Sequence, residues 1–129
     1  MKKKIIGIVC GCMMMLLMSI SVFAATSYFS IYLPIKSGDT ELAPVKKETT
    51  KDFFWVVIDT IGSGTNKVCV WAEGELGANL SSPTKQAGIG GHGIDYTTVP
   101  SVGKKVVLNF DNPVYLNYTV TVTGGWTPN

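Results

Sequence analysis

Apolar and polar residues alternate along much of the chain after its first two dozen residues. In Tyr28–Ile35 the apolar side chains occupy one side and polar or tyrosine side chains the other, which is typical of a half-buried strand. Pro34 has no backbone N–H to donate, so we expect this strand at a sheet edge. The predicted inner residues are Phe29, Ile31, Leu33 and Ile35, and the predicted outer residues are Tyr28, Ser30 and Tyr32.

The middle of the chain predicts a second pair of strands. Phe53–Ile61 is apolar on both faces near its start, which favours a central strand covered on both sides. The loop "GSGTNK" follows, and "KVCVWAE" returns with Val68 and Val70 on one face and Cys69 and Trp71 on the other. Two β-rich runs joined by a Gly-containing loop predict a hairpin. Before them, "KSGDTELAP" predicts a loop, and "VKKETTKD" is compatible with a short polar strand or a simple connection.

The C-terminal third has the longest alternation. After a first run and a "DNP" turn, Val114–Thr123 alternates five times, with threonines on the face that we predict to be solvated. No sustained apolar stripe at helical spacing occurs after residue 24. We therefore predict an all-β chain, a single small antiparallel β-sandwich over residues 25–129. The predicted core-facing residues of this third are Val106, Leu108, Phe110, Val114, Leu116, Tyr118, Val120 and Val122.

The N-terminus predicts export. Met1–Lys4 is basic, an apolar run follows, and "SVFAATS" ends it. Cleavage after Ala24 places Val22 and Ala24 at the two small-residue positions that signal peptidase reads, so we predict a signal peptide over residues 1–24 and a secreted mature chain. An uncleaved membrane anchor is the first alternative, because the apolar run is near spanning length. A lipoprotein acylated at Cys12 is the second alternative, but it would leave too short an apolar region before the cysteine.

Removal of the signal peptide changes the charge and the cysteine count. Three of the 11 lysines leave, so 8 lysines face 9 acidic residues, and the chain has no arginine. We therefore expect no nucleic acid partner. The chain after residue 24 carries no second long apolar segment, so we also expect a mature form that does not span a membrane. Cys69 remains as the single cysteine, which excludes an intrachain disulfide. Its position beside Trp71 in a strand predicts a small buried thiol.

The segment "QAGIGGHGIDY" contains a G-x-G-x-x-G match and the single histidine, His92. A phosphate site of that type needs a helix after the glycines, and "IDYTTVPSVG" cannot start one. We predict instead a mobile glycine-rich surface loop over Glu73–Asp95. His92 lacks the partners of a zinc site, with a weak surface contact through Asp95 as the alternative. We predict no catalytic residue, no cofactor and no metal site.

The aromatic residues are the candidate contact residues. Exposed aromatics are enriched in contact surfaces for proteins and sugars, although a small sandwich can also bury them in its core. Trp126 follows Gly124-Gly125 near the C-terminus and either closes the core or projects to bind something; the high average burial of tryptophan favours closure. The candidates are Tyr28, Tyr32, Tyr96, Tyr115 and Trp126.

Two short motifs carry a resemblance. The turn at Gly64-Thr65 precedes a strand containing Trp71, and Val122, Gly124 and Trp126 form V-x-G-x-W near the end. These positions resemble a family of small secreted proteins of Gram-positive bacteria, known mainly as a domain of unknown function. The acidic ending of that family is replaced here by "TPN". The general plan, a signal peptide followed by a short β domain rich in glycine and aromatic residues, is also similar to that of lactococcin-type bacteriocins. Neither resemblance implies a catalytic residue.

Three function classes follow. The first is a non-catalytic binding or matrix protein at the cell envelope, whose partner is an envelope component or another protein. The second is a bacteriocin-like secreted effector that acts on neighbouring cells. The third is a small secreted hydrolase, which the absence of a recognisable catalytic motif disfavours.

Overall fold

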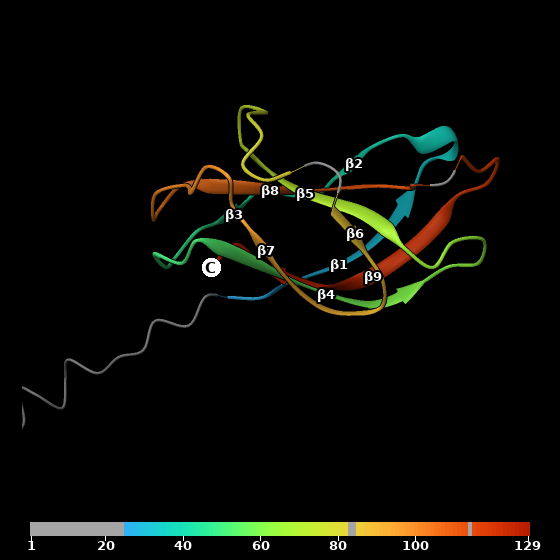
Figure 1. Ribbon diagram of the computed structural model, residues 1–129, viewed down its shortest axis with the longest axis horizontal. Coiled ribbons are helices and arrows are strands. Elements are labelled where there is room, and N and C mark those ends of the chain that lie inside the picture. The colour runs from blue at the N-terminus through green and yellow to red at the C-terminus, as the bar shows by residue number, and fades with distance from the viewer. Residues whose placement is uncertain (1–24, 83–84, 114) are drawn as a thin grey trace, which may run out of the picture.

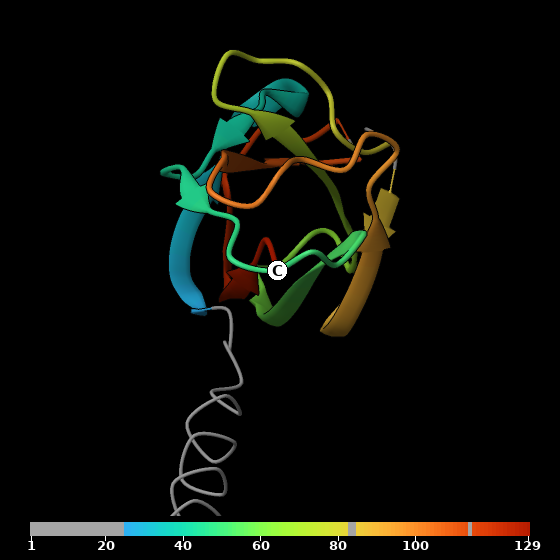
Figure 2. The ribbon, with the colours of Figure 1, turned by 90° about the vertical axis from the view of Figure 1, so that its left-hand side faces the viewer.

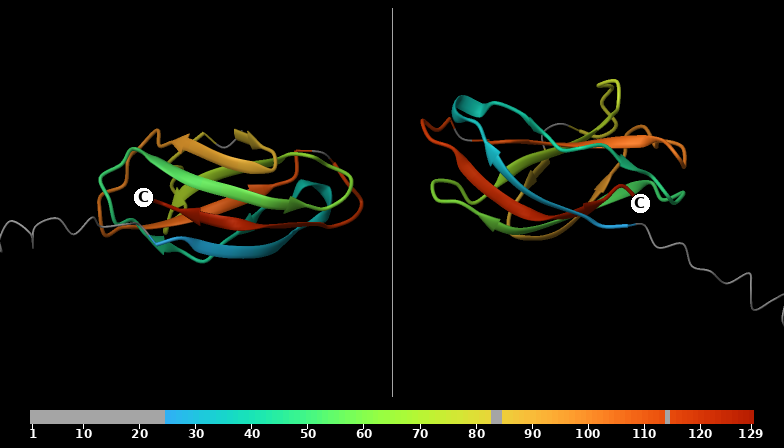
Figure 3. Two further views of the ribbon diagram at one scale, coloured as in Figure 1. Left: turned by 90° about the horizontal axis from the view of Figure 1, so that it is seen from below. Right: turned by 180° about the vertical axis from the view of Figure 1, so that it is seen from behind.

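The computed structural model describes residues 25–82, 85–113 and 115–129 as two antiparallel sheets packed face to face (Figures 1 and 2). Sheet A contains, in spatial order, β1 (Ser27–Leu33), β9 (Val120–Thr127), β4 (Phe53–Ile61) and β7 (Gly90–Asp95) (Figure 3, left). Sheet B contains β2 (Thr40–Glu41), β8 (Lys105–Asp111), β5 (Val68–Gly74) and β6 (Lys85–Ala87), and β3 (Val45–Lys46) also pairs with β8. The predicted all-β sandwich is confirmed.

The predicted signal peptide, residues 1–24, lies outside the described residues, as does Val114. Within the described part of the chain, no helix has the length and apolar character needed to cross a membrane.

The hydrophobic core lies between the two sheets and receives alternate residues from the inner face of each. Sheet A contributes residues from β1, β4, β7 and β9, and sheet B contributes residues from β5, β6 and β8. The largest fully buried apolar side chains are Trp126, Phe54, Phe110, Leu33, Ile58, Leu108, Val56, Val68, Val70, Val106 and Val120.

The first predicted strand is present at a sheet edge, as β1, but it is shorter than expected. Leu33 is fully buried, and the side chains between it and Ser27 alternate between half-buried and exposed. Ile35 is not a core residue, because the chain leaves the sheet at Pro34 and enters a short 3-10 turn, η1 (Ile35–Ser37), where Ile35 is 46% exposed.

β4 has the predicted bounds, but its predicted burial on both sides is wrong. Its inner residues pack in the core, whereas Trp55 and Asp59 on the opposite face are exposed. The apolar run at the start of β4 therefore reflects an exposed aromatic rather than a second covering layer.

The predicted hairpin between β4 and β5 is also wrong. β4 pairs with β7 and β9 in sheet A, and β5 pairs with β6 and β8 in sheet B, so the "GSGTNK" segment crosses between sheets. Among the described pairings, β5 and β6 are the single pair of consecutive strands that bond to each other. A local sequence pattern predicts the strands but cannot indicate which sheet receives each one.

The strand predicted from the long C-terminal alternation is only half right. Val120 and Val122 are buried on the inner face of β9, but residues 115–119 form no strand, and Tyr118 is 47% exposed. β9 instead continues through Gly124 and Gly125 as far as Thr127. A Cβ at Gly124 would overlap the carbonyl oxygen of Val57, so the close approach of β4 requires glycine at this position.

The predicted glycine-rich loop over Glu73–Asp95 is only partly right, because its first two residues end β5 and Lys85–Ala87 forms β6. Gly90–Asp95 forms β7, which pairs with β4 along six residues and buries Ile94. Glycine disfavours a strand because of its backbone entropy. Pairing with β4 and burial of Ile94 outweigh that preference here.

A buried lysine holds the residues that follow β9. The side chain of Lys47 is fully buried, and its Nζ donates hydrogen bonds to the carbonyl oxygens of Lys51 and Asn129. Burial lowers the pKa of Lys47, and the nearby Asp52 carboxylate partly opposes this effect. The two carbonyl oxygens therefore accept hydrogen bonds from the Lys47 amine, which would be costly to bury without them.

Trp126→Ala is expected to lower the free energy of unfolding by about 3 kcal/mol or more, because it empties a large buried aromatic site. The side chain is 1% exposed and lies between β1 and β4 on the inner face. Urea denaturation measures the change. Tyr115→Ala is the matched control, since its ring is 65% exposed, and it should change stability by less than about 0.5 kcal/mol. Equal stability of the two variants would contradict the core role of Trp126.

Candidate functional site

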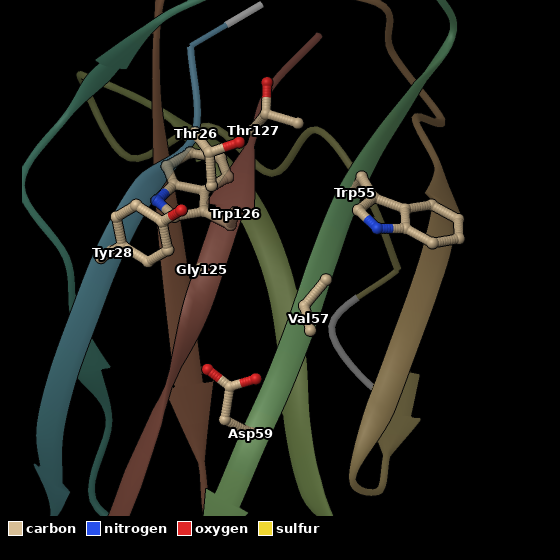
Figure 4. Close-up of a pocket in the computed structure, with 8 residues that line it drawn as sticks. All are labelled: Thr26, Tyr28, Trp55, Val57, Asp59, Gly125, Trp126 and Thr127. Carbon is tan, nitrogen blue, oxygen red and sulfur yellow. The ribbon is translucent and has the colours of Figure 1, made fainter.

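The outer face of sheet A carries an open groove of about 360 Å³ (Figure 4). Its walls come from β1 and β4, and its floor is formed where β9 passes between them. Tyr28 and Trp55 lie on opposite sides of the groove, with Gly125 and Val57 between them (Figure 4). The lining residues are Thr26, Tyr28, Trp55, Val57, Asp59, Gly125, Trp126 and Thr127.

The indole of Trp55 rests on the backbone of β7. A Cβ at Gly91 would lie 2.8 Å from Cζ2 of Trp55, and a Cβ at Gly93 would lie 3.2 Å from Cζ3. Both glycines pair across to β4 on the outer face, Gly93 directly opposite Trp55. The missing side chains therefore let the ring lie across the strand, while 42% of the residue remains exposed.

Tyr28 is supported in a similar way on the other side. Gly125 is its cross-strand partner on β9, and a Cβ there would lie 3.3 Å from Cδ1 of the ring. The ring leans over this glycine and is nevertheless 83% exposed. Both walls of the groove are thus aromatic rings placed against glycine backbone, which leaves one aromatic surface on each side available to a ligand.

A β-bulge places the groove's carboxylate. The pairing of β4 with β9 shifts between Ile58 and Thr60, so Asp59 is the extra residue and both Asp59 and Thr60 face outward. The Thr60 and Thr123 hydroxyl oxygens lie 2.6 Å apart and share a hydrogen bond. The bulge therefore supplies one negative charge at one end of the groove, next to a hydroxyl pair that lies outside the groove lining.

The groove has no positive charge of its own. None of its eight lining residues is a lysine or histidine, and Asp59 carries its one formal charge. Lys51 lies near the start of β4, where its Nζ is 5.5 Å from the centre of the Phe53 ring. The groove itself therefore has a negative to neutral character.

The structure separates the five predicted contact aromatics. Tyr28 and Tyr32 share the outer face of β1, and Tyr32 is 68% exposed. Tyr115 is exposed in the β8–β9 connection and does not line the groove. Tyr96 and Trp126 are in the core cluster, 7% and 1% exposed, although Trp126 also borders the groove. The assignment of Tyr96 to the surface is therefore wrong.

Two site residues escaped the sequence analysis. Trp55 lies within an apolar run, so the pattern indicated burial, and Asp59 occupies an outward position that depends on the bulge. One signal could have identified Trp55. Alternate glycines at Gly91 and Gly93 leave a bare strip on β7 for a large ring on the neighbouring strand.

His92 is engaged locally. Its Nε2 lies 2.7 Å from the carbonyl oxygen of Gly88. No group of three or more His, Cys, Asp or Glu side chains that could hold a metal ion occurs among the described residues.

Cys69 does not occupy the core, contrary to the prediction. It is half-buried on the outward face of β5, opposite Asp111 on β8, while Val68 and Val70 point inward. Partial burial raises the pKa of the thiol, and the Asp111 carboxylate raises it further. A raised pKa lowers the thiolate fraction at neutral pH and makes this cysteine a poor nucleophile.

Gly91→Ala should displace the Trp55 ring with little loss of stability. The added methyl group forces the indole away from β7, while the free energy of unfolding should change by about 1 kcal/mol or less. Acrylamide quenching of tryptophan fluorescence measures ring exposure, because Trp71 and Trp126 are only 7% and 1% exposed. Gly74→Ala is the control, since the nearest atom to its added Cβ is 3.8 Å away. Unchanged quenching in Gly91→Ala would show that the glycine does not support the ring.

The stability provided by Tyr96 should depend on pH. Its hydroxyl donates to the carbonyl oxygen of Pro128 at 2.8 Å, and burial raises its pKa above the ordinary 10.0. The contribution is therefore complete below pH 10.0 and is lost as the pH rises, because the unfolded chain ionises first. Urea denaturation of wild type and Tyr96→Phe between about pH 8 and about pH 11 should show their stability difference shrinking. A constant difference would mean that Tyr96 is not buried as a neutral phenol.

Comparison of the chain with models of known protein families, with curated proteins and with solved structures gives no match. The resemblance to small secreted Gram-positive proteins stays a prediction from the motifs of the sequence.

Proposed function

We propose that the chain is an exported, non-catalytic binding protein that attaches to a component of the cell envelope through the groove on sheet A. One observation carries the proposal: Tyr28 and Trp55, two large rings on opposite sides of a groove, are exposed and held against glycine backbone. Single exposed apolar residues need no explanation, but two aromatics that frame one groove indicate a contact surface.

The support beneath the rings favours a binding role. A side chain that already lies in one place loses little conformational entropy when a ligand covers it. Tyrosine and tryptophan offer large contact areas with few rotatable bonds, and here the backbone of β7 and β9 lies directly beneath the two rings. The groove is therefore organised before a ligand arrives.

The composition of the groove supports a non-catalytic role. Hydrolysis of a glycosidic bond commonly uses two carboxyl groups facing each other, and acyl transfer needs a nucleophile with an adjacent base. Asp59 is the single carboxylate among the eight lining residues, which include no serine, cysteine or histidine.

The proposed export is supported by the N-terminal sequence and by the position of Ala25. The backbone nitrogen of Ala25 donates to Oε2 of Glu48 at 3.3 Å. Cleavage after Ala24 would turn this nitrogen into an ammonium group, and the contact would become a charge-assisted hydrogen bond. The folded domain can therefore accommodate a mature chain that starts at this residue.

The purified mature protein should sediment with isolated envelopes of the producing cell, and the double variant Tyr28→Ala/Trp55→Ala should lose most of this binding. Both substitutions leave the core between the sheets intact, so the variant should stay folded, with a modest loss of stability because Trp55 no longer covers β7. Sedimentation followed by quantitative immunoblotting measures the bound fraction.

Tyr115→Ala provides the control, because it removes another exposed ring that does not line the groove. Equal sedimentation of the double variant and the wild type would refute the proposed surface. Recovery of the protein solely from the culture medium, with no envelope binding, would favour the secreted effector instead.

A further inference from the structure

We infer that the ligand of this groove is an uncharged, extended carbohydrate chain, which rests on the faces of Trp55 and Tyr28 and hydrogen-bonds to Asp59 and the neighbouring hydroxyls. The inference rests on the proposed function, and it adds the chemical class of the ligand. It follows from the ring surfaces, the polar groups and the charge of the groove.

The ring surfaces suit a flat ligand with an apolar face. One face of the Trp55 indole contacts β7 at Gly91 and Gly93, so the opposite face is available to solvent. The C–H groups on one side of a sugar ring form such an apolar face, and they carry partial positive charge toward the negative face of an aromatic ring. A lipid tail would instead favour a deeper apolar cleft, whereas this groove is open and has a glycine at its centre.

The polar groups around the rings match a ligand rich in hydroxyls. The Asp59 carboxylate only accepts hydrogen bonds, so the ligand must supply donors. Thr26 and Thr127, at the other end of the groove, can both donate and accept (Figure 4). Sugar hydroxyls also do both, so a single chain can satisfy a carboxylate at one end and threonines at the other.

The charge of the groove disfavours anionic ligands. Phosphate-containing polymers, nucleic acids and uronic acid polymers all need cations, and the lining residues include none. Asp59 would repel each of them. The lining of the groove therefore favours neutral envelope polymers over acidic ones.

The dimensions suit a chain rather than a single sugar. β1 and β4 are separated by β9, so the strands that carry Tyr28 and Trp55 lie about 10 Å apart at the usual strand spacing. Tyr32 lies four residues beyond Tyr28 on the same face of β1, about 13 Å along the strand. Because the groove is open, it can accept the interior of a polymer as well as its end.

Binding of soluble oligosaccharides to the purified mature protein tests the ligand class. The probes are chitohexaose and cellohexaose as neutral chains and oligogalacturonate as an acidic chain of similar geometry. Isothermal titration calorimetry measures affinity, and tryptophan fluorescence reports contact because Trp55 is the most exposed tryptophan. We expect at least one neutral chain to bind and oligogalacturonate to bind at least about tenfold more weakly.

Variants then locate the binding. Tyr28→Ala and Trp55→Ala should each weaken binding of the neutral chain by about tenfold or more, and Asp59→Asn should weaken it by about threefold to tenfold. Asp59→Asn should also reduce the discrimination against oligogalacturonate, which a merely structural role of Asp59 would not do. Tyr115→Ala and Gly74→Ala are the controls and should bind as the wild type does.

The outcomes separate the inference from the proposed function. Envelope binding that is lost in Tyr28→Ala/Trp55→Ala, combined with no binding of either neutral chain, would overturn the carbohydrate inference and leave the binding surface standing. Stronger binding of oligogalacturonate than of the neutral chains would overturn it as well. Neutral-chain binding that persists in the double variant would place the carbohydrate elsewhere on the chain and overturn the inference, whereas the proposed function would still be decided by envelope sedimentation.

Discussion

Burial of the inner face of β9 is the interaction on which the rest of the structure depends. This strand pairs with β1 on one side and β4 on the other, and its inner residues Val120, Val122 and Trp126 are all at most 1% exposed. Side chains alternate along a strand, so when these residues face the core, Gly125 and Thr127 must lie on the outer face. The packing of the core therefore fixes the floor of the groove.

Glycine on the outer face of sheet A gives the site its form. Gly91, Gly93 and Gly125 weaken their strands intrinsically, because glycine loses more backbone entropy on folding than other residues. Strand pairing on both sides of β4 and the buried residues beneath it outweigh that loss. The bare backbone lies beneath two aromatic rings at the surface, so glycines that weaken the strands locally also make room for both rings.

The groove cannot form from any local part of the chain. Its walls and floor belong to β1, β4 and β9, and the ring of Trp55 also rests on β7. Most connections cross between the sheets, so these strands come together only when the whole sandwich is assembled. A variant that loosens the core should therefore also weaken the groove, which is why matched surface controls matter in tests of binding.

The sequence by itself determined the strand class, the bounds of β4, the edge position of β1 and the inward residues of β8 and of the start of β9, because alternation reports which side of a strand is buried. It also identified Tyr28 as an outward aromatic. Only the tertiary structure decided that β4 and β5 enter different sheets, that the glycine-rich segment pairs as β7, and that a bulge turns Asp59 outward. These features depend on which distant strands become neighbours. Pairing of that kind is set by the fit of whole surfaces, which no local pattern of residues contains.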